Sequence, residues 1–417
     1  MKKRKVYLDN SATTVVASEV IKEMEPYFGA IYGNPSSFHF FGRMAKTAID
    51  KSRVKIADLL NANPEEILFT SCGTESDNIA IFGLLNAYGK KGHIITTRIE
   101  HHAVLYSCRH LEEFGYEVTY LGVDKDGVIS VEDFKKAVKD NTIFVSIMHA
   151  NNEVGAIQPI EIIANELKKI NESRKNKICF HTDAVQTAGK LFLDVKKLGV
   201  DMLALSAHKF NGPKGIGVLY VKKDIKISPV MFGGHHESGL RPGTENIASI
   251  VGCAKALEIS NIAIESNEKH ILYLREKLKK GILEAIPETV VNGSGARAVS
   301  NILNISFNYI EGEALLLMLD MKGIAVSTGS ACASGSSEPS HVLSSMCVDP
   351  VVAQGAVRFS FGHYNTEEDV DYVLKVLPKI VSKLYSMSPV LNLSLSDRER
   401  QYLREKKFNR KTPSSKR

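Results

Sequence analysis

The sequence predicts an α/β fold built on a parallel sheet, followed by a smaller α+β part. Two observations indicate the sheet. From about residue 66 to residue 221 short β-rich runs alternate with helical patterns, and those runs are almost continuously apolar. Strands have this composition when helices cover both faces of a parallel sheet. The third observation is length, because 417 residues exceed a single ordinary domain of ~150 residues.

The predicted strands are, in order, EILFTS, HIITTR, YEVTYLGV, IFVSIMHA, KICFHTDA, DMLALSAHK and GIGVLYV, and helical patterns follow the first two. A pattern rich in Glu, Lys and Leu runs from about residue 254 to residue 285 and contains no Pro or Gly until Gly281. It predicts one long helix that links this core to a second unit. The sequence after it then reads strand, helix, strand, loop, strand, helix, as in a small α+β domain.

These patterns predict a large domain at residues 15–258, a smaller domain made of residues 1–14 and 259–392, and a flexible basic tail at residues 393–417. Residues 401–417 hold seven basic residues and one acidic residue, a net +6 that equals the formal charge of the whole chain. The first 400 residues therefore sum to zero. A body without net charge carries no nucleic-acid footprint, so the tail is the only basic candidate for docking a partner.

Composition also indicates the compartment in which the protein is located. No apolar run approaches the ~20 residues that a bilayer span needs, and no apolar segment follows the basic N-terminus as it would in a secretory signal. Six cysteines are scattered without a C-x-x-C pair, which indicates neither a zinc site nor a disulfide framework. Unpaired thiols in a large chain fit a reducing compartment. We expect a soluble, cytoplasmic protein with no membrane contact and no resident metal.

Polar residues follow several predicted strands, where open α/β sheets keep their sites. FTSCGTESDN places Gly73 and Thr74 at the start of a helix, and free backbone N–H groups there favour an anion such as a phosphate. A plain helix cap at Thr74, with Asp77 completing a capping box, explains this stretch equally well. In HTDAVQTAG, Asp183 ends a strand, and an acid there can hold a protonated ring nitrogen or cap a helix.

The stretch LSAHKFNGPKG is the most informative, because Ser206, His208 and Lys209 end a strand there. Lysine is rarely buried without a reason. A neutral lysine is the nucleophile that a Schiff base requires, and its ordinary pKa of about 10.4 must be lowered by burial or by a neighbouring charge. Lys214 competes for this role, but its GPKG setting is typical of a turn, so Lys209 is preferred.

Cys332 lies in STGSACASGSSEPS, among Ser, Gly and Ala residues. A lone cysteine is usually a small buried hydrophobe, but these neighbours offer little to pack against, which leaves a tight turn as the structural alternative. A free thiol has a pKa of about 8.5, so its site must lower that value to make it reactive. Loops of small residues can move. We therefore predict a reactive thiol on a mobile loop.

Together and in this order, these stretches resemble the class V aminotransferase family of pyridoxal 5'-phosphate (PLP) enzymes. YLDNSATT, GNPSS, EHHAV, HANNEVG, RPGTEN and TGSAC narrow the resemblance to the cysteine desulfurases of the NifS and IscS group, from about residue 6 to residue 390. The resemblance implies a fold-type I transferase with a mostly parallel seven-stranded sheet, a PLP cofactor and a homodimer. It also implies an enzyme that converts L-cysteine to L-alanine and passes the sulfur to acceptors such as an iron–sulfur scaffold or a tRNA-thiolation protein.

The resemblance assigns a role to each matched residue. Lys209 would bind PLP covalently, Cys332 would carry the sulfur as a persulfide, and His101 would stack on the ring and move protons. Asp183 would pair with the ring nitrogen and Gln186 with the phenolic oxygen. The rest of the cofactor site would be Gly73, Thr74, Asn152, Ser206, His208 and, from the neighbouring subunit, Thr244, and the substrate would meet Asn34, Asn152 and Arg358. Taken alone, His101 would be read as a core or surface histidine and Arg358 as part of a surface salt bridge. No metal is implied, although Cys332 could join a scaffold partner in holding an iron–sulfur cluster transiently.

One position departs from the family pattern and two alternatives remain. Cys72 stands where the family more often has glycine, and a positive φ there would strain cysteine. A selenocysteine lyase would share the fold and the cofactor. A non-catalytic platform for sulfur assembly is the alternative from another class. The long loop around Cys332 favours the NifS and IscS type, and the presence of Cys332 favours sulfur transfer. The presence of both Lys209 and Cys332 argues against a non-catalytic platform.

Overall fold

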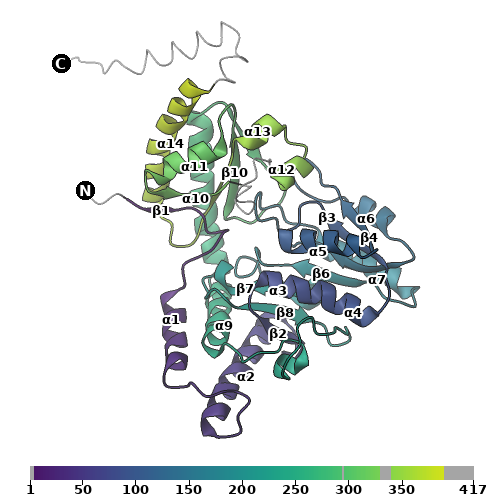
Figure 1. Ribbon diagram of the computed structural model, residues 1–417. Helices are drawn as coiled ribbons and strands as arrows, with labels where there is room; N and C mark the ends of the chain where they lie inside the picture. The colour runs from purple at the N-terminus through teal and green to yellow at the C-terminus, as the bar shows by residue number, and fades with distance from the viewer. Residues whose placement is uncertain (1–3, 294, 329–339, 389–417) are drawn as a thin grey trace, which may run out of the picture.

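The structure is a computed structural model that describes residues 4–293, 295–328 and 340–388. It contains a large sheet with helices on both faces and a small antiparallel sheet beside long helices (Figure 1). The predicted α/β fold class is confirmed. The domain boundary at residue 258 stays a prediction, and both Cys332 and the predicted basic tail lie outside the described residues.

Among the described residues, seven strands form the large sheet. Their spatial order is β2 (Ile67–Thr70), β8 (Gly217–Val221), β7 (Met202–Ser206), β6 (Cys179–Asp183), β5 (Thr142–Ser146), β3 (His93–Thr97) and β4 (Glu117–Leu121). In this sheet β8 runs antiparallel to both of its neighbours, and the other pairs are parallel. Residues 207–216 are too few for the crossover of a dozen or more residues that a parallel neighbour would need. The short connection therefore reverses β8.

Both faces of the large sheet are buried. Phe144 and Val145 are neighbours on β5, yet they belong to different hydrophobic cores, because successive strand side chains point to opposite faces. The core that contains Phe144 is covered by the π-helical turn η3 (Ile79–Gly83), α4 (Leu84–Tyr88) and α5 (His102–Glu113), while α3 (Gly73–Asn78) packs on β7 and β8. The opposite core is covered by α1 (Ser18–Met24), α2 (Phe40–Leu60), α6 (Val131–Ala137), α7 (Ile160–Glu172), α8 (Val195–Leu198) and α9 (Ile247–Ile262).

The small sheet has the order β12 (Ala356–Ser360), β10 (Ile302–Phe307) and β9 (Thr289–Asn292), and all of its pairs are antiparallel. Its core is closed by α10 (Ile264–Ala285), α11 (Gly312–Asp320) and α14 (Glu367–Met387). The buried residues of α14 are Val370, Val373, Leu377, Ile380 and Val381, whose spacing marks one face of an amphipathic helix. That face explains why α14 docks against α10 and α11 (Figure 1).

The single helix predicted over residues 254–285 is wrong. The chain forms α9 and α10, which are bent by 72° at a break around Ala263. No Pro or Gly marks this break. Leu257 in α9 packs in the core of the large sheet, whereas Leu274 in α10 packs in the core of the small sheet, so each helix follows its own core. In the described part of the chain no single helix is long and apolar enough to cross a membrane, and this bent pair meets the length and composition criteria only when its two helices are taken together.

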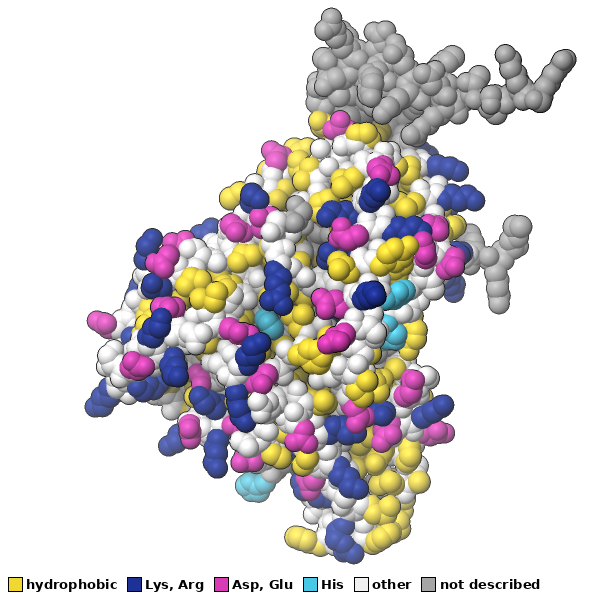
Figure 2. All heavy atoms as spheres, turned by 180° about the vertical axis from the view of Figure 1, so that it is seen from behind, with side chains coloured by type: hydrophobic (Ala, Val, Ile, Leu, Met, Phe, Trp, Pro, Cys, Tyr) yellow, Lys and Arg dark blue, Asp and Glu magenta, His cyan; other side chains and the backbone are white. Residues whose placement is uncertain are grey.

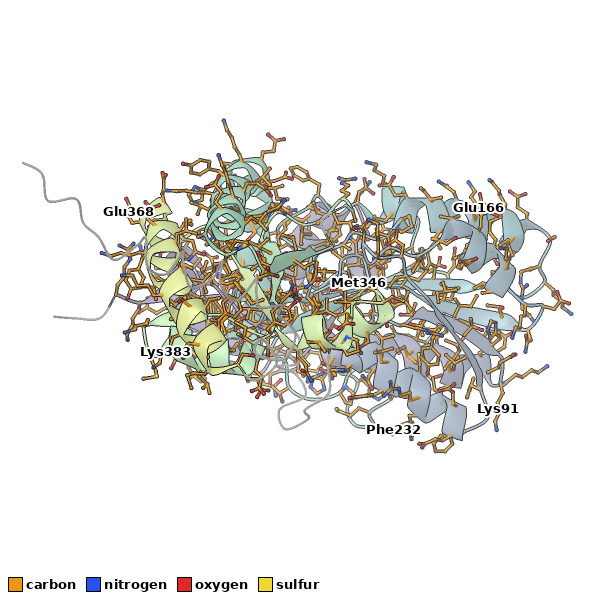
Figure 3. All side chains as sticks on the ribbon, turned by 90° about the horizontal axis from the view of Figure 1, so that it is seen from above. Lys91, Glu166, Phe232, Met346, Glu368 and Lys383 are labelled. Atoms are coloured by element: carbon orange, nitrogen blue, oxygen red, sulfur yellow. The ribbon has the colours of Figure 1, made fainter. Side chains whose placement is uncertain are left out.

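The N-terminal segment and two short helices are among the connections between the parts. The N-terminal strand β1 (Val6–Tyr7) pairs in parallel with β11 (Ile324–Ala325), and Asp9 continues this segment alongside Ser360. The short helices α12 (His341–Ser345) and α13 (Pro350–Gln354) form another connection. Met346, just after α12, shares a buried cluster with Ile99 and Met148 of the large part, and Figure 3 shows it between α14 and the helices of the large sheet.

Candidate active site

The candidate site lies along one edge of the large sheet. The parallel strands β2, β3, β5, β6 and β7 all end at this edge, and each is followed by predicted site residues. These are Gly73 and Thr74 after β2, His101 after β3, Asn152 after β5, Asp183 and Gln186 at the end of β6, and Ser206, His208 and Lys209 at the end of β7. The structure therefore brings together side chains separated by more than a hundred residues, at the edge where open α/β sheets bind ligands.

Lys209 ends a short 3₁₀ turn, η4 (Ala207–Lys209), directly after β7. Its Nζ donates hydrogen bonds to the carbonyl oxygens of Ser11 (2.6 Å) and Ala12 (2.8 Å). Thr14 of the same segment donates to the carbonyl of His208, through its backbone N–H and its hydroxyl. The N-terminal segment therefore holds Lys209 in place. The motif YLDNSATT indicates the family but not this contact, because backbone carbonyls leave no trace in residue type.

Three side chains around Lys209 fit a ring that carries a phosphate. Asp183 is buried, accepts a hydrogen bond from the Val185 N–H (2.9 Å), and burial raises its pKa to about 6. Ser206 Oγ and Gln186 Oε1 are buried and have no hydrogen-bond partner among the described residues. Unpaired buried polar atoms are costly in a folded protein. A ligand with polar atoms would satisfy both, and a protonated ring nitrogen would favour the ionised form of Asp183.

The turn before α3 corrects two expectations. Cys72, not Thr74, is the N-cap residue, and it makes no side-chain cap hydrogen bond, so the capping-box alternative for Thr74 and Asp77 is wrong. Cys72 has φ −171°, which is extended backbone that any residue adopts, so cysteine causes no strain there. A Cβ on Gly73 would lie 2.8 Å from Val185 Cγ2. The missing side chain therefore lets α3 begin close to the strand ends.

Two histidines at this edge are held neutral. His101 caps α5 with Nδ1, which accepts a hydrogen bond from the Ala103 N–H (3.1 Å). Burial, aided by the charge of Lys209, lowers the pKa of His101 to about 4, and the same causes lower the pKa of His208 to about 4. His208 Nδ1 also lies 3.1 Å from the hydroxyl of Thr13. A neutral imidazole can both accept and donate a proton near neutral pH.

Arg358 lies in β12 and points toward the N-terminal segment. Its Nη2 donates to Asp9 Oδ1 (3.0 Å) and its Nη1 donates to the carbonyl of Asn152 (2.8 Å), while Nε is buried without a partner among the described residues. The alternative of a surface salt bridge is wrong, because Arg358 is buried. An arginine in this state keeps free N–H groups that can bind a carboxylate.

Behind Asp183 lies a group of buried ionisable side chains that the sequence did not single out. Burial, with the charge of Asp183, raises the pKa of Asp77 well above its ordinary value. Burial and the charge of Asp183 also raise the pKa of Glu100, to about 8, although hydrogen bonds from the Met148 N–H and the Thr97 hydroxyl oppose this rise. His181 Nε2 lies 3.6 Å from Asp77 Oδ1, and burial lowers the pKa of His181 to about 3. Glu100 and His181 are therefore neutral near pH 7, and burial disfavours the ionised form of Asp77. Among the described residues no cluster of His, Cys, Asp and Glu is placed to hold a metal ion.

Comparisons with known proteins agree with this geometry. A family model described as Aminotransferase class-V matches residues 6–373. The chain belongs to the class V aminotransferases. This class V aminotransferase is similar to two curated proteins named Cysteine desulfurase IscS. The one from Methanosarcina thermophila is 52% identical over 387 residues, covering 92% of this chain and 94% of the relative. The one from Dictyoglomus turgidum is 48% identical over 388 residues, covering 93% of this chain and 97% of the relative.

Solved structures give the same result for this class V aminotransferase. One described as a NifS-like protein is 42% identical, with a TM-score of 0.85 over 91% of this chain and all of its own. Another, described as SspA in complex with cysteine, is 36% identical, with a TM-score of 0.77 over 87% of this chain and all of its own. The resemblance to the desulfurases of the NifS and IscS group is confirmed. Enzymes of this family depend on PLP.

Two predicted site residues of this class V aminotransferase stand apart from the others. Asn34 is exposed in the loop before α2, where its side chain accepts a hydrogen bond from the Ser36 N–H (2.9 Å). Thr244 is exposed in the loop before α9. Both side chains are exposed, whereas Asp183 is buried. Their roles stay predictions, and Thr244 was expected to act on a neighbouring subunit.

Proposed function

We propose that this protein is a PLP-dependent cysteine desulfurase, which takes sulfur from L-cysteine, releases L-alanine and keeps the sulfur as a persulfide on Cys332. One observation carries the proposal: Lys209, Asp183 and the unpaired oxygens of Gln186 and Ser206 meet at a single sheet edge. A nucleophilic amine, a buried acid and unpaired polar oxygens serve no common structural purpose. The desulfurases among the relatives support the same conclusion.

The residues present fit PLP. Asp183 would pair with the ring nitrogen, Gln186 with the phenolic oxygen, and Ser206, His208 and Thr74 with the phosphate, next to the Gly73 N–H at the start of α3. His101 would lie against the ring, and Thr244 of a second subunit would reach the phosphate. When bound, PLP supplies an electron sink for negative charge at the substrate Cα.

The protein's own groups would do the remaining work. Arg358 would bind the substrate carboxylate with its free N–H groups, in an orientation that Asp9 and the Asn152 carbonyl fix. The Lys209 amine would move the proton at the substrate Cα, with neutral His101 as a second proton carrier. Asn34 and Asn152 would complete the substrate site.

Sulfur transfer would take place between two sulfur atoms. The Cys332 thiolate attacks the substrate sulfur, an S–S bond forms, and the C–S bond breaks with its electron pair left on Cβ. That carbon then takes a proton, so the products are L-alanine and a persulfide. The persulfide would pass to an acceptor such as an iron–sulfur scaffold or a tRNA-thiolation protein.

The homodimer and the cytoplasmic location belong to the same proposal. Hydrophobic side chains gather at the lower end of the molecule, over α1 and the start of α2 (Figure 2). The exposed ones include Phe28, Tyr32, Phe38, Phe40 and Phe41, and Phe38 is 95% exposed. Large exposed apolar patches mark interaction sites, and a second copy of this chain would cover this one. The unpaired cysteines fit a reducing cytoplasm.

The decisive experiment replaces Cys332 by serine and measures alanine release from L-cysteine. Cys332→Ser should reduce the rate to background while the protein keeps its yellow cofactor. Cys347→Ser is the matched control, because Cys347 is also a free cysteine and is exposed, and it should keep the parent rate. Alanine release by Cys332→Ser at the parent rate would disprove the sulfur-carrying role. Running the same assay with selenocysteine separates a desulfurase from a selenocysteine lyase.

A further inference from the structure

A second lysine touches the site and has no part in the function described above. Lys190 follows the turn after β6, and its Nζ donates to the carbonyl oxygens of Gln186 (3.0 Å) and Lys209 (3.3 Å). These carbonyls belong to two residues of the candidate site, which lie on turns after different strands. One ammonium group therefore ties the Gln186 turn to the Lys209 turn.

The surroundings of Lys190 do not neutralise its charge. In the described ranges Lys190 has no ion-pair partner, and its ammonium donates to two neutral carbonyls. It lines a cavity of about 50 Å³ between the two parts of the molecule, which Lys209, Glu268 and His363 also line. Burial, together with the charge of Lys209, lowers the pKa of Lys190 to about 7. A buried lysine is normally paired with an acidic side chain, whereas Lys190 lies beside another lysine.

The other charged groups near Lys209 do not replace this effect. Asp183 favours the protonated amine, because it carries the opposite charge. His101 and His208 interact with Lys209, but burial keeps both rings neutral near pH 7. Among the described residues, Lys190 and Lys214 are therefore the like charges near this group, and Lys190 is the buried one of the two. Two neighbouring amines titrate as a pair, and each makes it easier for the other to lose its proton.

We propose that Lys190 is a positioning residue for Lys209: its ammonium fixes the backbone of the Lys209 turn against that of Gln186, and its like charge favours the neutral, nucleophilic form of the Lys209 amine. A cationic neighbour is one of the established ways to activate a lysine nucleophile. The inference rests on the proposed function and deepens it. The sequence does not indicate this role of Lys190, since AGKLF looks like an ordinary turn.

The test measures PLP capture by the full-length apoprotein as a function of pH, following the yellow colour that develops. Lys190→Met and Lys190→Gln remove the charge, and Lys190→Arg keeps it. Lys214→Met is the matched control, because Lys214 is an exposed lysine five residues after Lys209. The pH midpoint of capture should rise by roughly 0.5–1 unit in the Met and Gln variants, so that capture at about pH 6, where Lys190 carries its charge, slows about 3- to 10-fold. Lys190→Arg and Lys214→Met should stay near the parent midpoint.

The outcomes separate three cases. A purely structural lysine would give Met and Gln variants that melt at lower temperature with an unchanged midpoint, and this result would overturn the inference. An arginine variant that shifts as far as the methionine variant would overturn it as well. A parent protein that takes up no PLP at any pH would instead contradict the proposed function. A raised midpoint in either neutral variant, with arginine restoring the parent value, supports the inference.

Discussion

Replacing Gly73 by alanine tests whether the start of α3 holds the phosphate. The new Cβ would lie 2.8 Å from Val185 Cγ2 and 3.5 Å from Ser206 Cβ. Carbon atoms in contact are normally about 3.5–4.0 Å apart. Val185 is β-branched and has few rotamers, so the first turn of α3 has to move away from the strand end that carries Ser206.

Two opposing effects set the size of the change. Alanine favours a helix over glycine by about 0.5–1 kcal/mol, whereas overpacking costs about 1–3 kcal/mol. The apoprotein should therefore lose at most about 2.5 kcal/mol of unfolding free energy. The displaced N–H groups would also weaken hydrogen bonds to a charged phosphate, each of which contributes about 1.5–3 kcal/mol. PLP affinity should fall by roughly 10- to 100-fold.

Titration of the apoprotein with PLP, followed by absorbance, measures this loss. Gly122→Ala is the control, because a Cβ at Gly122 would meet nothing within 4 Å, and its affinity should match that of the parent. A thermal melt of both apoproteins separates lost binding from lost folding. If Gly73→Ala bound PLP as tightly as Gly122→Ala, the start of α3 would not be the phosphate site.

Two further predictions concern the ion pairs and buried acids of the site. Asp9→Ala should raise the KM for cysteine by about 10-fold in the alanine-release assay, because Arg358 loses a charged hydrogen bond of about 1.5–3 kcal/mol that fixes its orientation. Asp9→Asn keeps an acceptor and should change KM by less than about 3-fold, and equal effects of the two would refute this role. The pKa of Glu100 is raised from 4.5 to about 8, so the folded state binds more protons and its stability falls as pH rises through this range. Glu100→Gln should remove a decline on the order of a few kcal/mol, measured by urea unfolding of the apoprotein at about pH 5 and about pH 8, and parallel declines in variant and parent would contradict it.

Local patterns predicted the strands well and the long-range contacts poorly. Each of the seven predicted strand sequences overlaps a strand of the large sheet, because its apolar run is a local property. The reversal of β8 was implicit in the short connection before it, but a pattern of apolar residues does not record direction. The break at Ala263 has no local signal, since it arises from two cores that each bind one helix.

The same distinction holds in the site. Asp183 and Lys209 could be predicted because polar residues at strand ends are visible in the sequence, and the structure brings them to one edge. The carbonyls of Ser11 and Ala12 that hold Lys209 could not. Nor could the extended φ of Cys72, because residue type does not fix a backbone angle.

The position of the N-terminal segment also determines when the site can be completed during synthesis. β1 pairs with β11, and Asp9 meets Arg358 in β12, so both partners leave the ribosome more than 300 residues later. At about 5–20 residues per second, this delay is on the order of tens of seconds. The large sheet can form first, but the carbonyls of Ser11 and Ala12 reach Lys209 only when the first segment docks. A nascent chain therefore holds Lys209 in its final setting only after nearly all of the chain has been made.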